Sequence, residues 1–443
     1  MKKQHLMRIS ILSIAFLATS LLTINAQTVV GTYGRLQVTT IQKGNNNNFP
    51  IVGDENGNPI SLGGMSLFWS NAGDSFDGYT SQTVNHLVDD WDIAIIRAAM
   101  GVKEDWDNGN GYVDNPQGQM VKIRNVIDAA IAKGIYVIVD YHTHNAENYK
   151  TEAITFFKEI ATLYGNNDNI IYEIFNEPIG DYDDAARRNL WNNTIKPYAE
   201  DVIDEIRNID PDNLIVVGTP YFDQGVDIAS ENQINDNNVA YALHFYAGAL
   251  FNGNENTDHT TGGRQKALTA LGRGAALFVT EWGTVDSDGA GSPDIDKSND
   301  WFDFMEENHI SHANWAVSDK NEGASVVNSG QGIIGLLNNQ LTETGNYVRN
   351  KLKEIAANQQ LSTENFTLNG EQISLFPNPA TDILNLETSK TNITSVKIVD
   401  MQGRQVLSND YNSLKASINV SSLSKGIYIM EINNTAGTQF VVK

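Results

Sequence analysis

Cysteine is absent from the 443 residues of this chain. Its absence excludes disulfides, zinc sites built on cysteine and thiol nucleophiles. A chain of this length can bury a large core without disulfides, so the lack of cysteine does not indicate an intracellular protein. Any catalytic group in the chain must therefore be something other than a thiol.

Basic residues are also scarce, with 30 Lys and Arg against 54 Asp and Glu, for a formal net charge of -24. Such a surface repels a phosphate backbone, so we expect no nucleic-acid partner. It does not repel a neutral polymer such as a polysaccharide. The hydrophobic content of 41% is ordinary for a folded protein and predicts a sizeable core.

Long apolar runs are limited to one, at residues 9–22. It follows three basic residues and precedes the small residue Ala26, which is the layout of a secretory signal peptide over residues 1–26. A membrane anchor is the alternative. Because no later run has spanning length, we expect a mature protein without a membrane span, secreted and either extracellular or attached to the cell surface.

Several motifs for nucleotide, metal and hydrolase sites are missing. The chain has no Walker loop, no HExxH metalloprotease motif and no GxSxG nucleophile elbow. Two acidic stretches, 105–109 and 286–296, superficially resemble calcium loops but lack the EF-hand spacing with its final glutamate. We interpret both as solvated loops and expect no metal site.

A regular alternation of short apolar runs and amphipathic segments is present between residues 60 and 357. Eight runs have the composition of buried strands: 60–68, 93–98, 135–141, 170–175, 214–218, 240–245, 276–280 and 313–317. Helical spacing of apolar residues is found between many of them: 121–132, 153–164, 190–209, 300–307 and 342–356. Near-continuous apolar strands alternating with helices predict a parallel sheet buried on both faces.

Eight such units favour the α/β class and closure into a (β/α)8 TIM barrel over residues 27–358. A doubly wound open sheet is the alternative, but no glycine-rich phosphate loop follows the first strand. The polar stretch before residue 60 contains a short β-patch, Leu36–Thr40. We expect it to form a hairpin that caps one end of the barrel.

The composition changes after Asn358, and residues 359–372 are polar and are predicted to be a linker. From 373 to 443 short alternating strands return, separated by turn signals. They are predicted at 383–387, 395–399, 418–420, 427–432 and 438–442. This pattern predicts a small all-β, sandwich-like C-terminal domain in which nothing resembles a catalytic site.

Two carboxylates stand at predicted strand ends, where a TIM barrel places its active site. The fourth strand ends in YEIFNEP, which contains Glu177, and the seventh in FVTEWG, which contains Glu281. Other polar or aromatic residues stand at the ends of further strands: Arg97, His142, His144, Asn176, His244, Tyr246 and Trp315. Glycosidic cleavage needs such a pair, one nucleophile and one proton donor, which retaining enzymes hold about 5–5.5 Å apart.

The accompanying residues suit this chemistry. Arg97 and Tyr246 can keep a nucleophilic carboxylate ionised. Asn176 can bind a sugar hydroxyl, and Trp315 and Trp69 can stack on sugar rings. Each residue alone has an ordinary structural explanation, such as an ion pair, a core histidine or simple packing. Their joint placement at strand ends is what favours a site.

These strand ends resemble those of the family 5 glycoside hydrolases, and in particular the bacterial endoglucanases (cellulases) of that family. The resemblance covers roughly residues 27–357. Besides NEP, HFYA and TEWG it includes GMSLFWSN, IIRAAMGV, VIVDYHTHNAEN, NTIKPYAEDVIDEIRNIDPDNLIVVGTP and NWAVSDKNEGAS. It implies a (β/α)8 barrel and a retaining mechanism without cofactor or metal, with Glu177 as the acid/base and Glu281 as the nucleophile.

The same resemblance implies a set of substrate-binding residues. Those that line the cleavage subsite are Arg97, His142, Asn176, His244, Tyr246 and Trp315. Lys320 and Glu322 match polar contacts to the neighbouring glucose on the non-reducing side, and Trp69 is a weaker match. Relatives often place another tryptophan shortly after this strand, but residues 70–90 contain none.

The tail resembles the C-terminal sorting domains of type IX secretion in Bacteroidetes. The segments that carry this resemblance are LFPNPATDILNLE, VKIVDMQGRQV, LSKGIYIMEI and a terminal VVK. It implies that residues 373–443 are an export address read by the type IX secretion machinery and cleaved after export. Binding of cellulose by the tail is the alternative.

The predicted function is a secreted endo-β-1,4-glucanase that hydrolyses cellulose or a related β-glucan. Other β-glycanases, acting on mixed-linkage glucan, xylan or mannan, are alternatives because subsite loops determine the choice of polymer. A non-catalytic glycan-binding surface protein on a decayed barrel is a further alternative. The intact pair Glu177 and Glu281 argues against that last reading.

Overall fold

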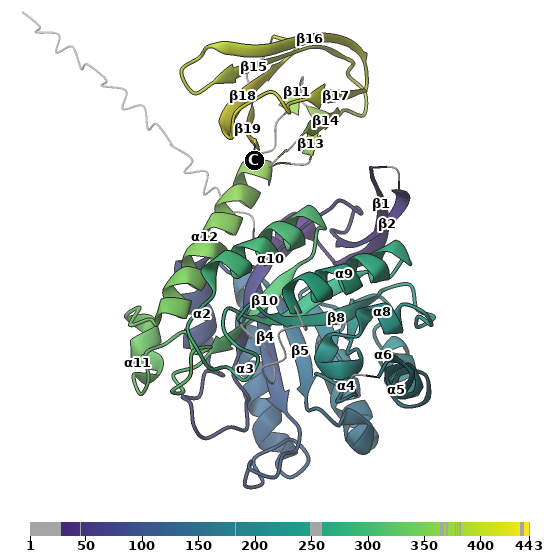
Figure 1. The fold of residues 1–443 in the computed structure, drawn as a ribbon, viewed down its shortest axis with the longest axis vertical. Helices are drawn as coiled ribbons and strands as arrows, with labels where there is room; N and C mark the ends of the chain where they lie inside the picture. The colour runs from purple at the N-terminus through teal and green to yellow at the C-terminus, as the bar shows by residue number, and fades with distance from the viewer. Residues whose placement is uncertain are drawn as a thin grey trace, which may run out of the picture.

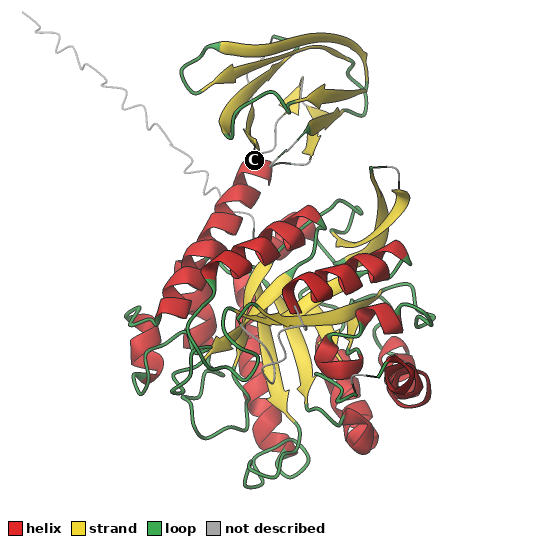
Figure 2. Cartoon of the chain, in the orientation of Figure 1, coloured by secondary structure: helices red, strands yellow, loops and turns green. Residues whose placement is uncertain are grey.

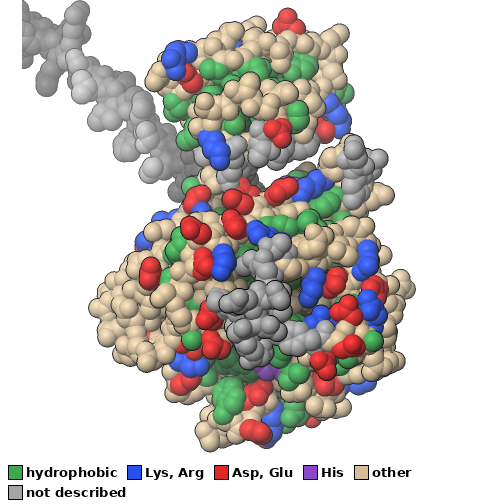
Figure 3. Space-filling view, in the orientation of Figure 1, with side chains coloured by type: hydrophobic (Ala, Val, Ile, Leu, Met, Phe, Trp, Pro, Cys, Tyr) green, Lys and Arg blue, Asp and Glu red, His purple; other side chains and the backbone are tan. Residues whose placement is uncertain are grey.

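The computed structural model describes residues 28–442, except 45, 182, 249–258, 364–366, 369–370, 377, 379, 381 and 435–437. The predicted signal peptide therefore lies outside the described residues. The chain forms a barrel of parallel strands surrounded by helices, followed by a smaller module of antiparallel strands (Figure 1). Acidic and basic side chains are interspersed over the described part of the face in Figure 3, without a continuous basic surface.

Eight parallel strands close into a barrel in the order β10-β3-β4-β5-β6-β7-β8-β9. Their bounds are β3 (Gly63–Leu67), β4 (Ile95–Gly101), β5 (Tyr136–His142), β6 (Ile170–Glu173), β7 (Ile215–Val217), β8 (Val239–Tyr246), β9 (Leu277–Gly283) and β10 (His312–Val317). Each coincides with one of the eight predicted runs. The predicted TIM barrel is thus confirmed, and the open sheet was the wrong alternative.

Helices surround the barrel (Figure 2). The longer ones are α2 (Ser81–Trp91), α3 (Pro116–Lys133), α4 (Lys150–Tyr164), α6 (Lys196–Arg207), α9 (His259–Gly272), α10 (Ile295–Glu307) and α12 (Glu343–Thr363). Shorter turns are α1 (Val29–Tyr33), η1 (Ala146–Tyr149), α5 (Asp184–Leu190), η2 (Trp191–Ile195), α7 (Pro220–Asp223), α8 (Val226–Ala229) and α11 (Gly332–Leu337). None of the helices in the described ranges has the length and hydrophobicity needed to cross a bilayer.

Alternate residues along the strands face two different cores. On β4, Ile96 packs outward in the large core between barrel and helices, whereas Ile95 packs in the barrel interior. Leu36 and Val52 join that interior core from the predicted hairpin, which is observed as β1 (Gln37–Lys43) and β2 (Asn46–Gly53). The hairpin closes the end of the barrel at which the strands begin, so the opposite end is left for polar residues.

The C-terminal module has two antiparallel sheets. One contains β13 (Ser374–Phe376), β14 (Ile383–Glu387) and β17 (Lys415–Asn419), and the other contains β15 (Ile393–Asp400), β16 (Gln405–Ser413), β18 (Gly426–Ile432) and β19 (Thr438–Val442). A short pair, β11 (Thr367–Leu368) and β12 (Glu371–Gln372), precedes them. The sheets enclose a hydrophobic core separate from the barrel cores. This confirms the predicted all-β C-terminal domain.

Helix α12 connects the two parts (Figure 1). It continues to Thr363 and so extends into the range predicted as linker, 359–372. Near its end Gln359 Nε2 donates to the carbonyl of Ser61, just before the first barrel strand, at 2.5 Å. The helix therefore ends at the edge of the barrel where the strands begin.

Candidate active site

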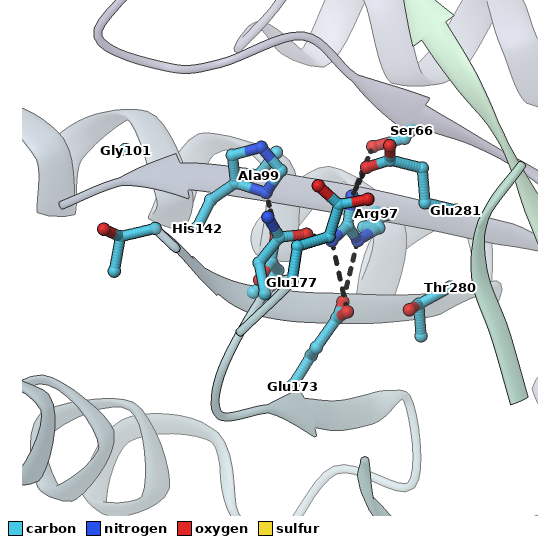
Figure 4. A network of polar contacts seen from close by, with 12 residues as sticks. Ser66, Arg97, Ala99, Gly101, His142, Glu173, Glu177, Thr280 and Glu281 are labelled. Atoms are coloured by element: carbon cyan, nitrogen blue, oxygen red, sulfur yellow. Dashed lines mark hydrogen bonds and ion pairs between the residues drawn. The ribbon is translucent and has the colours of Figure 1, made fainter. Parts of the chain in front are cut away.

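Arg97 of β4 is at the centre of a buried ionic network at the carboxyl ends of the strands (Figure 4). Its Nε donates to Glu173 Oε2 at 2.7 Å, Nη1 donates to Glu281 Oε2 at 2.9 Å, and Nη2 donates to Asn176 Oδ1 at 2.7 Å. Asp140 Oδ2 lies 2.9 Å from Nη2. One guanidinium thus holds together side chains from β5, β9 and the end of β6.

Glu281 faces the barrel mouth because of an irregularity in β9. The pairing of β8 with β9 shifts by one residue just before His244, which then lies opposite Glu281. Such a β-bulge redirects a side chain. Glu281 is buried, and its carboxylate accepts hydrogen bonds from the Tyr246 hydroxyl at 2.7 Å and from Arg97 Nη1 at 2.9 Å.

Glu177 follows β6 in the turn that breaks the strand, and its backbone is left-handed, with φ 49°. His244 Nδ1 lies 2.9 Å from its Oε1, and His144 Nδ1 lies 3.6 Å from its Oε2. The side chain remains 17% exposed. One carboxylate oxygen of Glu177 and one of Glu281 lie within 4.8 Å of each other.

The two carboxyls differ in their electrostatic surroundings. Burial raises the pKa of both, and the neighbouring Glu177 adds to the increase for Glu281. Arg97 and Tyr246 hydrogen-bond Glu281 and so favour its ionised form. Burial lowers the pKa of His244, the histidine bonded to Glu177, to about 4. Burial thus raises the pKa of both carboxyls, and the hydrogen bonds from Arg97 and Tyr246 oppose that increase at Glu281.

A row of rings, here called the aromatic wall, extends from the ionic network to the surface; it contains Trp315, His142, Trp69 and Trp106. His142 stacks on Trp315 with ring centroids 5.2 Å apart, and Trp69 packs edge-on to His142 at 4.0 Å. Trp106 packs edge-on to Trp69 at 5.4 Å and is 49% exposed. The stretch 105–109, predicted only as a solvated loop, thus adds an exposed ring beside Trp69.

Two polar side chains near this wall are fixed by their neighbours. His142 Nδ1 lies 2.6 Å from Asp140 Oδ2, and burial lowers the pKa of His142 well below its usual range. Asn176 is fully buried; its Oδ1 is occupied by Arg97, but its Nδ2 has no hydrogen-bond partner among the described residues. A buried donor without a partner is suited to bind a ligand oxygen.

Lys320 and Glu322 lie in the loop after β10 and form an ion pair at 2.9 Å. Lys320 Nζ lies 5.4 Å from the ring centroid of Phe68, which contacts Trp315 at 5.4 Å. The pair therefore lies one ring farther from the ionic network than Trp315. On the Glu177 side a cavity of about 240 Å³ opens; it is lined by residues that include His144, Phe222, Tyr246 and Ser287.

The structure thus brings the predicted site residues together, but sequence reasoning missed several of their partners. Asp140 and Glu173 were detectable, because each stands two residues along its strand from an inward-facing residue, Ile138 and Ile171. Asp223 was not. It accepts the backbone N–H of Glu177 at 2.8 Å across 46 residues of chain, and its own sequence context, PYFDQG, contains no signal of that contact.

Comparison with known families gives two matches. A model of the cellulase family, glycosyl hydrolase family 5, matches residues 53–321. A model of the secretion system C-terminal sorting domain matches residues 374–443. The matches confirm both resemblances predicted from the sequence.

Individual relatives point the same way. Endoglucanase Z of Dickeya dadantii is 51% identical over 280 residues, which cover 61% of this chain and 60% of that protein. An endoglucanase of Clostridium saccharobutylicum is 40% identical over 319 residues, covering 71% and 66%. The chain thus spans less than two thirds of the length of these curated relatives.

Solved structures cover the barrel. A structure from Cytophaga hutchinsonii has a TM-score of 0.63 and 39% identity, and covers 74% of this chain and 98% of that one. The catalytic domain of the Thermobifida fusca endoglucanase Cel5A has a TM-score of 0.61 and 32% identity, covering 74% and 99%. Nearly the whole of each structure is therefore matched by 74% of this chain.

Proposed function

The chain belongs to glycosyl hydrolase family 5, and from that membership we propose that it is an endo-β-1,4-glucanase acting on cellulose or a related β-glucan. The relatives that support this substrate class are named endoglucanases. The acidic composition is compatible with a neutral polysaccharide.

One observation carries the proposal: an oxygen of Glu177 lies within 4.8 Å of an oxygen of Glu281. Retaining glycosidases hold their two carboxyl groups about 5–5.5 Å apart, whereas inverting enzymes leave about 6.5–9.5 Å for a water molecule. The short separation supports a double displacement, in which one carboxylate attacks the sugar directly.

In the first step, Glu281 attacks the anomeric carbon and the bond from that carbon to the glycosidic oxygen breaks. Arg97 and Tyr246 hold Glu281 ionised for this attack. Glu177 transfers its proton to the departing oxygen, and the raised pKa of Glu177 suits a proton donor. The products are a covalent glycosyl ester on Glu281 and a released chain end.

In the second step, the now ionised Glu177 removes a proton from water, and that water attacks the anomeric carbon of the ester. The bond to Glu281 breaks, which regenerates its carboxylate and releases a sugar with the original anomeric configuration. Glu177 ends protonated, ready for another cycle. The two carboxyls supply the nucleophile, acid and base for both steps.

The surrounding residues provide the sugar contacts in this proposal. Asn176 Nδ2, which has no partner among the described residues, donates to a hydroxyl of the sugar at the cleaved bond. Trp315, Trp69 and His142 bind sugar rings and hydroxyls along the aromatic wall. His244 borders the subsite of the sugar at the cleaved bond. The ion pair of Lys320 and Glu322 contacts the neighbouring glucose on the non-reducing side.

Isosteric variants test these roles on carboxymethylcellulose and on aryl cellobiosides. Glu281→Gln should lose at least about 1,000-fold in kcat, because the covalent step has no nucleophile. Glu177→Gln should lose about 100-fold or more in kcat/KM on substrates whose leaving group needs a proton, but little in kcat/KM on a 2,4-dinitrophenyl glycoside, because kcat/KM reports the first step. Near-wild-type activity of Glu281→Gln, or a first product of inverted configuration by NMR, would contradict the mechanism.

We further propose that the protein is exported through type IX secretion and acts outside the cell. The match of residues 374–443 to the secretion sorting domain supports this localisation. A polymer too large to enter the cell also requires an enzyme outside it.

A further inference from the structure

Asp223 is a fully buried carboxylate that the mechanism above does not use. Its Oδ2 accepts the backbone N–H of Glu177 at 2.8 Å, and its Oδ1 accepts the backbone N–H of Thr219 at 2.5 Å. Among the described residues the basic group within ion-pair distance is His244, whose Nε2 lies 3.5 Å away. That nitrogen is 2.9 Å from the Thr280 hydroxyl, so Asp223 is held chiefly by backbone amides.

The backbone around Asp223 is unusual for L residues. Tyr221, Phe222 and Asp223 all have left-handed φ values, of 64°, 54° and 57°. Left-handed conformations are rare in residues with a side chain, and strain of this kind persists only where surrounding contacts impose it. Here the turn places the carboxylate of Asp223 within hydrogen-bond distance of the backbone of the turn that carries Glu177.

The two turns are fastened together at more than one point. Besides the Asp223 contact, the N–H of Phe222 donates to the carbonyl of Pro178 at 3.1 Å. Gly218 allows the close approach, since a Cβ there would lie 2.2 Å from the carbonyl oxygen of Phe175. Glu177 itself has a left-handed backbone, with φ 49°, and its N–H points to Asp223 Oδ2.

We propose that Asp223 is a positioning residue for the reaction: its carboxylate holds the left-handed backbone of Glu177 and so directs the Glu177 carboxyl toward Glu281. This inference rests on the proposed function, because it concerns the proton that Glu177 delivers. His244 completes the support, with Nδ1 2.9 Å from Glu177 Oε1. Backbone and side chain of the proton donor are thus held from one side by Asp223 and His244.

The test exploits the leaving group. A 2,4-dinitrophenolate departs without a proton, whereas phenolate needs one, so a misplaced acid slows only the second substrate. For Asp223→Asn we expect kcat/KM to fall about 10-fold to 100-fold on phenyl β-cellobioside and by less than about 3-fold on the dinitrophenyl glycoside. In Asp223→Asn the amide NH2 faces one of the two backbone N–H groups, whereas the hydroxyl of Asp223→Ser can accept one N–H bond without that repulsion, so Asp223→Ser should fall between wild type and Asp223→Asn.

Asp210→Asn is the matched control. Asp210 is also buried and also accepts backbone N–H groups, from Asp212 and Asn213, but it lies before β7 at the other end of the barrel. Asp210→Asn should not lower kcat/KM for one glycoside more than for the other. Glu177→Gln is the reference for complete loss of the proton donor: its kcat/KM should fall on phenyl β-cellobioside but little on the dinitrophenyl glycoside.

A selective loss of kcat/KM on phenyl β-cellobioside in Asp223→Asn would support the positioning role. Equal losses on both glycosides, or none, would overturn it, as would failure of both Asp223 variants to fold while Asp210→Asn folds, since Asp223 would then serve only stability. A wild-type protein that cleaves neither glycoside nor carboxymethylcellulose would instead overturn the proposed function. The two failures are therefore distinguishable.

Discussion

In the proposed mechanism, one hydrogen bond, from the hydroxyl of Tyr246, sets the charge of the nucleophile Glu281. It donates to Glu281 Oε1 at 2.7 Å and lowers the pKa of that group, against the increase caused by burial. The proposed attack on the sugar requires ionised Glu281, so we expect activity to be lost as the pH falls through the pKa of Glu281. The acid limb of the pH–rate profile therefore reports on this bond.

In Tyr246→Phe the pKa of Glu281 should rise, and the acid limb of kcat/KM should move to higher pH. We also expect kcat at the optimum to fall about 10-fold to 100-fold, the usual effect of losing a hydrogen bond to a charged group. The measurement is a pH–rate profile with a soluble β-glucan. Tyr136→Phe is the control, because its buried hydroxyl donates to Gly34 O at the closed end of the barrel. An unmoved acid limb in Tyr246→Phe would contradict this role.

At the residue scale, the predictable part of the site is the part that depends on residue type and strand ends. Glu177 and Glu281 could be proposed because a carboxylate after a buried strand faces the barrel mouth. The contacts of Asp223 could not, because three consecutive left-handed residues without glycine leave no mark in the sequence. The inward turn of Glu281 depends on a β-bulge, which simple alternation does not predict.

At the level of elements, the loop between β4 and α3 carries Trp106. Asp107 anchors it: the buried carboxylate accepts the N–H groups of Glu104 and Gly109, and Asn71 Nδ2 donates to it. The ring of Trp106 is therefore presented by a fixed loop, edge-on to Trp69. It extends the aromatic wall by one ring. Residues 70–90, which follow Trp69 in the chain, contain no tryptophan that could do so.

We predict that Trp106→Ala weakens the binding of long substrates selectively. An exposed ring stacked on a distal sugar contributes on the order of 0.5–1.5 kcal/mol, so KM for cellohexaose should rise about 3-fold to 10-fold while that for cellotriose stays nearly constant. Trp106→Phe keeps a ring and should lose less. Thermal unfolding should be unchanged, because Asp107 holds the loop. Equal changes for both oligosaccharides would show that the ring only covers Trp69.

The barrel strands were the most predictable elements, because strands buried on both faces are apolar without interruption. Helices were harder. α2 and α9 were not predicted, and the predicted helix at 190–209 is observed as η2 followed by α6. In the tail, β16 was missed because its residues are mostly exposed and polar. Apolar patterning does not detect a strand of that kind.

Across the whole molecule, the tail and the active site belong to opposite ends of the barrel. Gln359 of α12 contacts Ser61 at the edge where the strands begin, and the carboxyls of Glu177 and Glu281 lie at the edge where they end. The tail also has its own hydrophobic core. Removing it should therefore leave both the barrel core and the catalytic network intact.

A chain ending at Thr363 should accordingly keep kcat/KM for carboxymethylcellulose within about 2-fold of the full chain, since distant sites act independently.

Export, in contrast, should be lost on removal of the tail. In a bacterium with type IX secretion, the full chain should reach the medium or the cell surface, and the chain ending at Thr363 should stay inside the outer membrane. Ile418→Asp, which places a charge in the core of the tail, should be retained as well without losing activity in a lysate. Loss of glucanase activity on truncation would mean that the tail supports the catalytic fold, and normal export of the shortened chain would mean that residues 374–443 are not the export address.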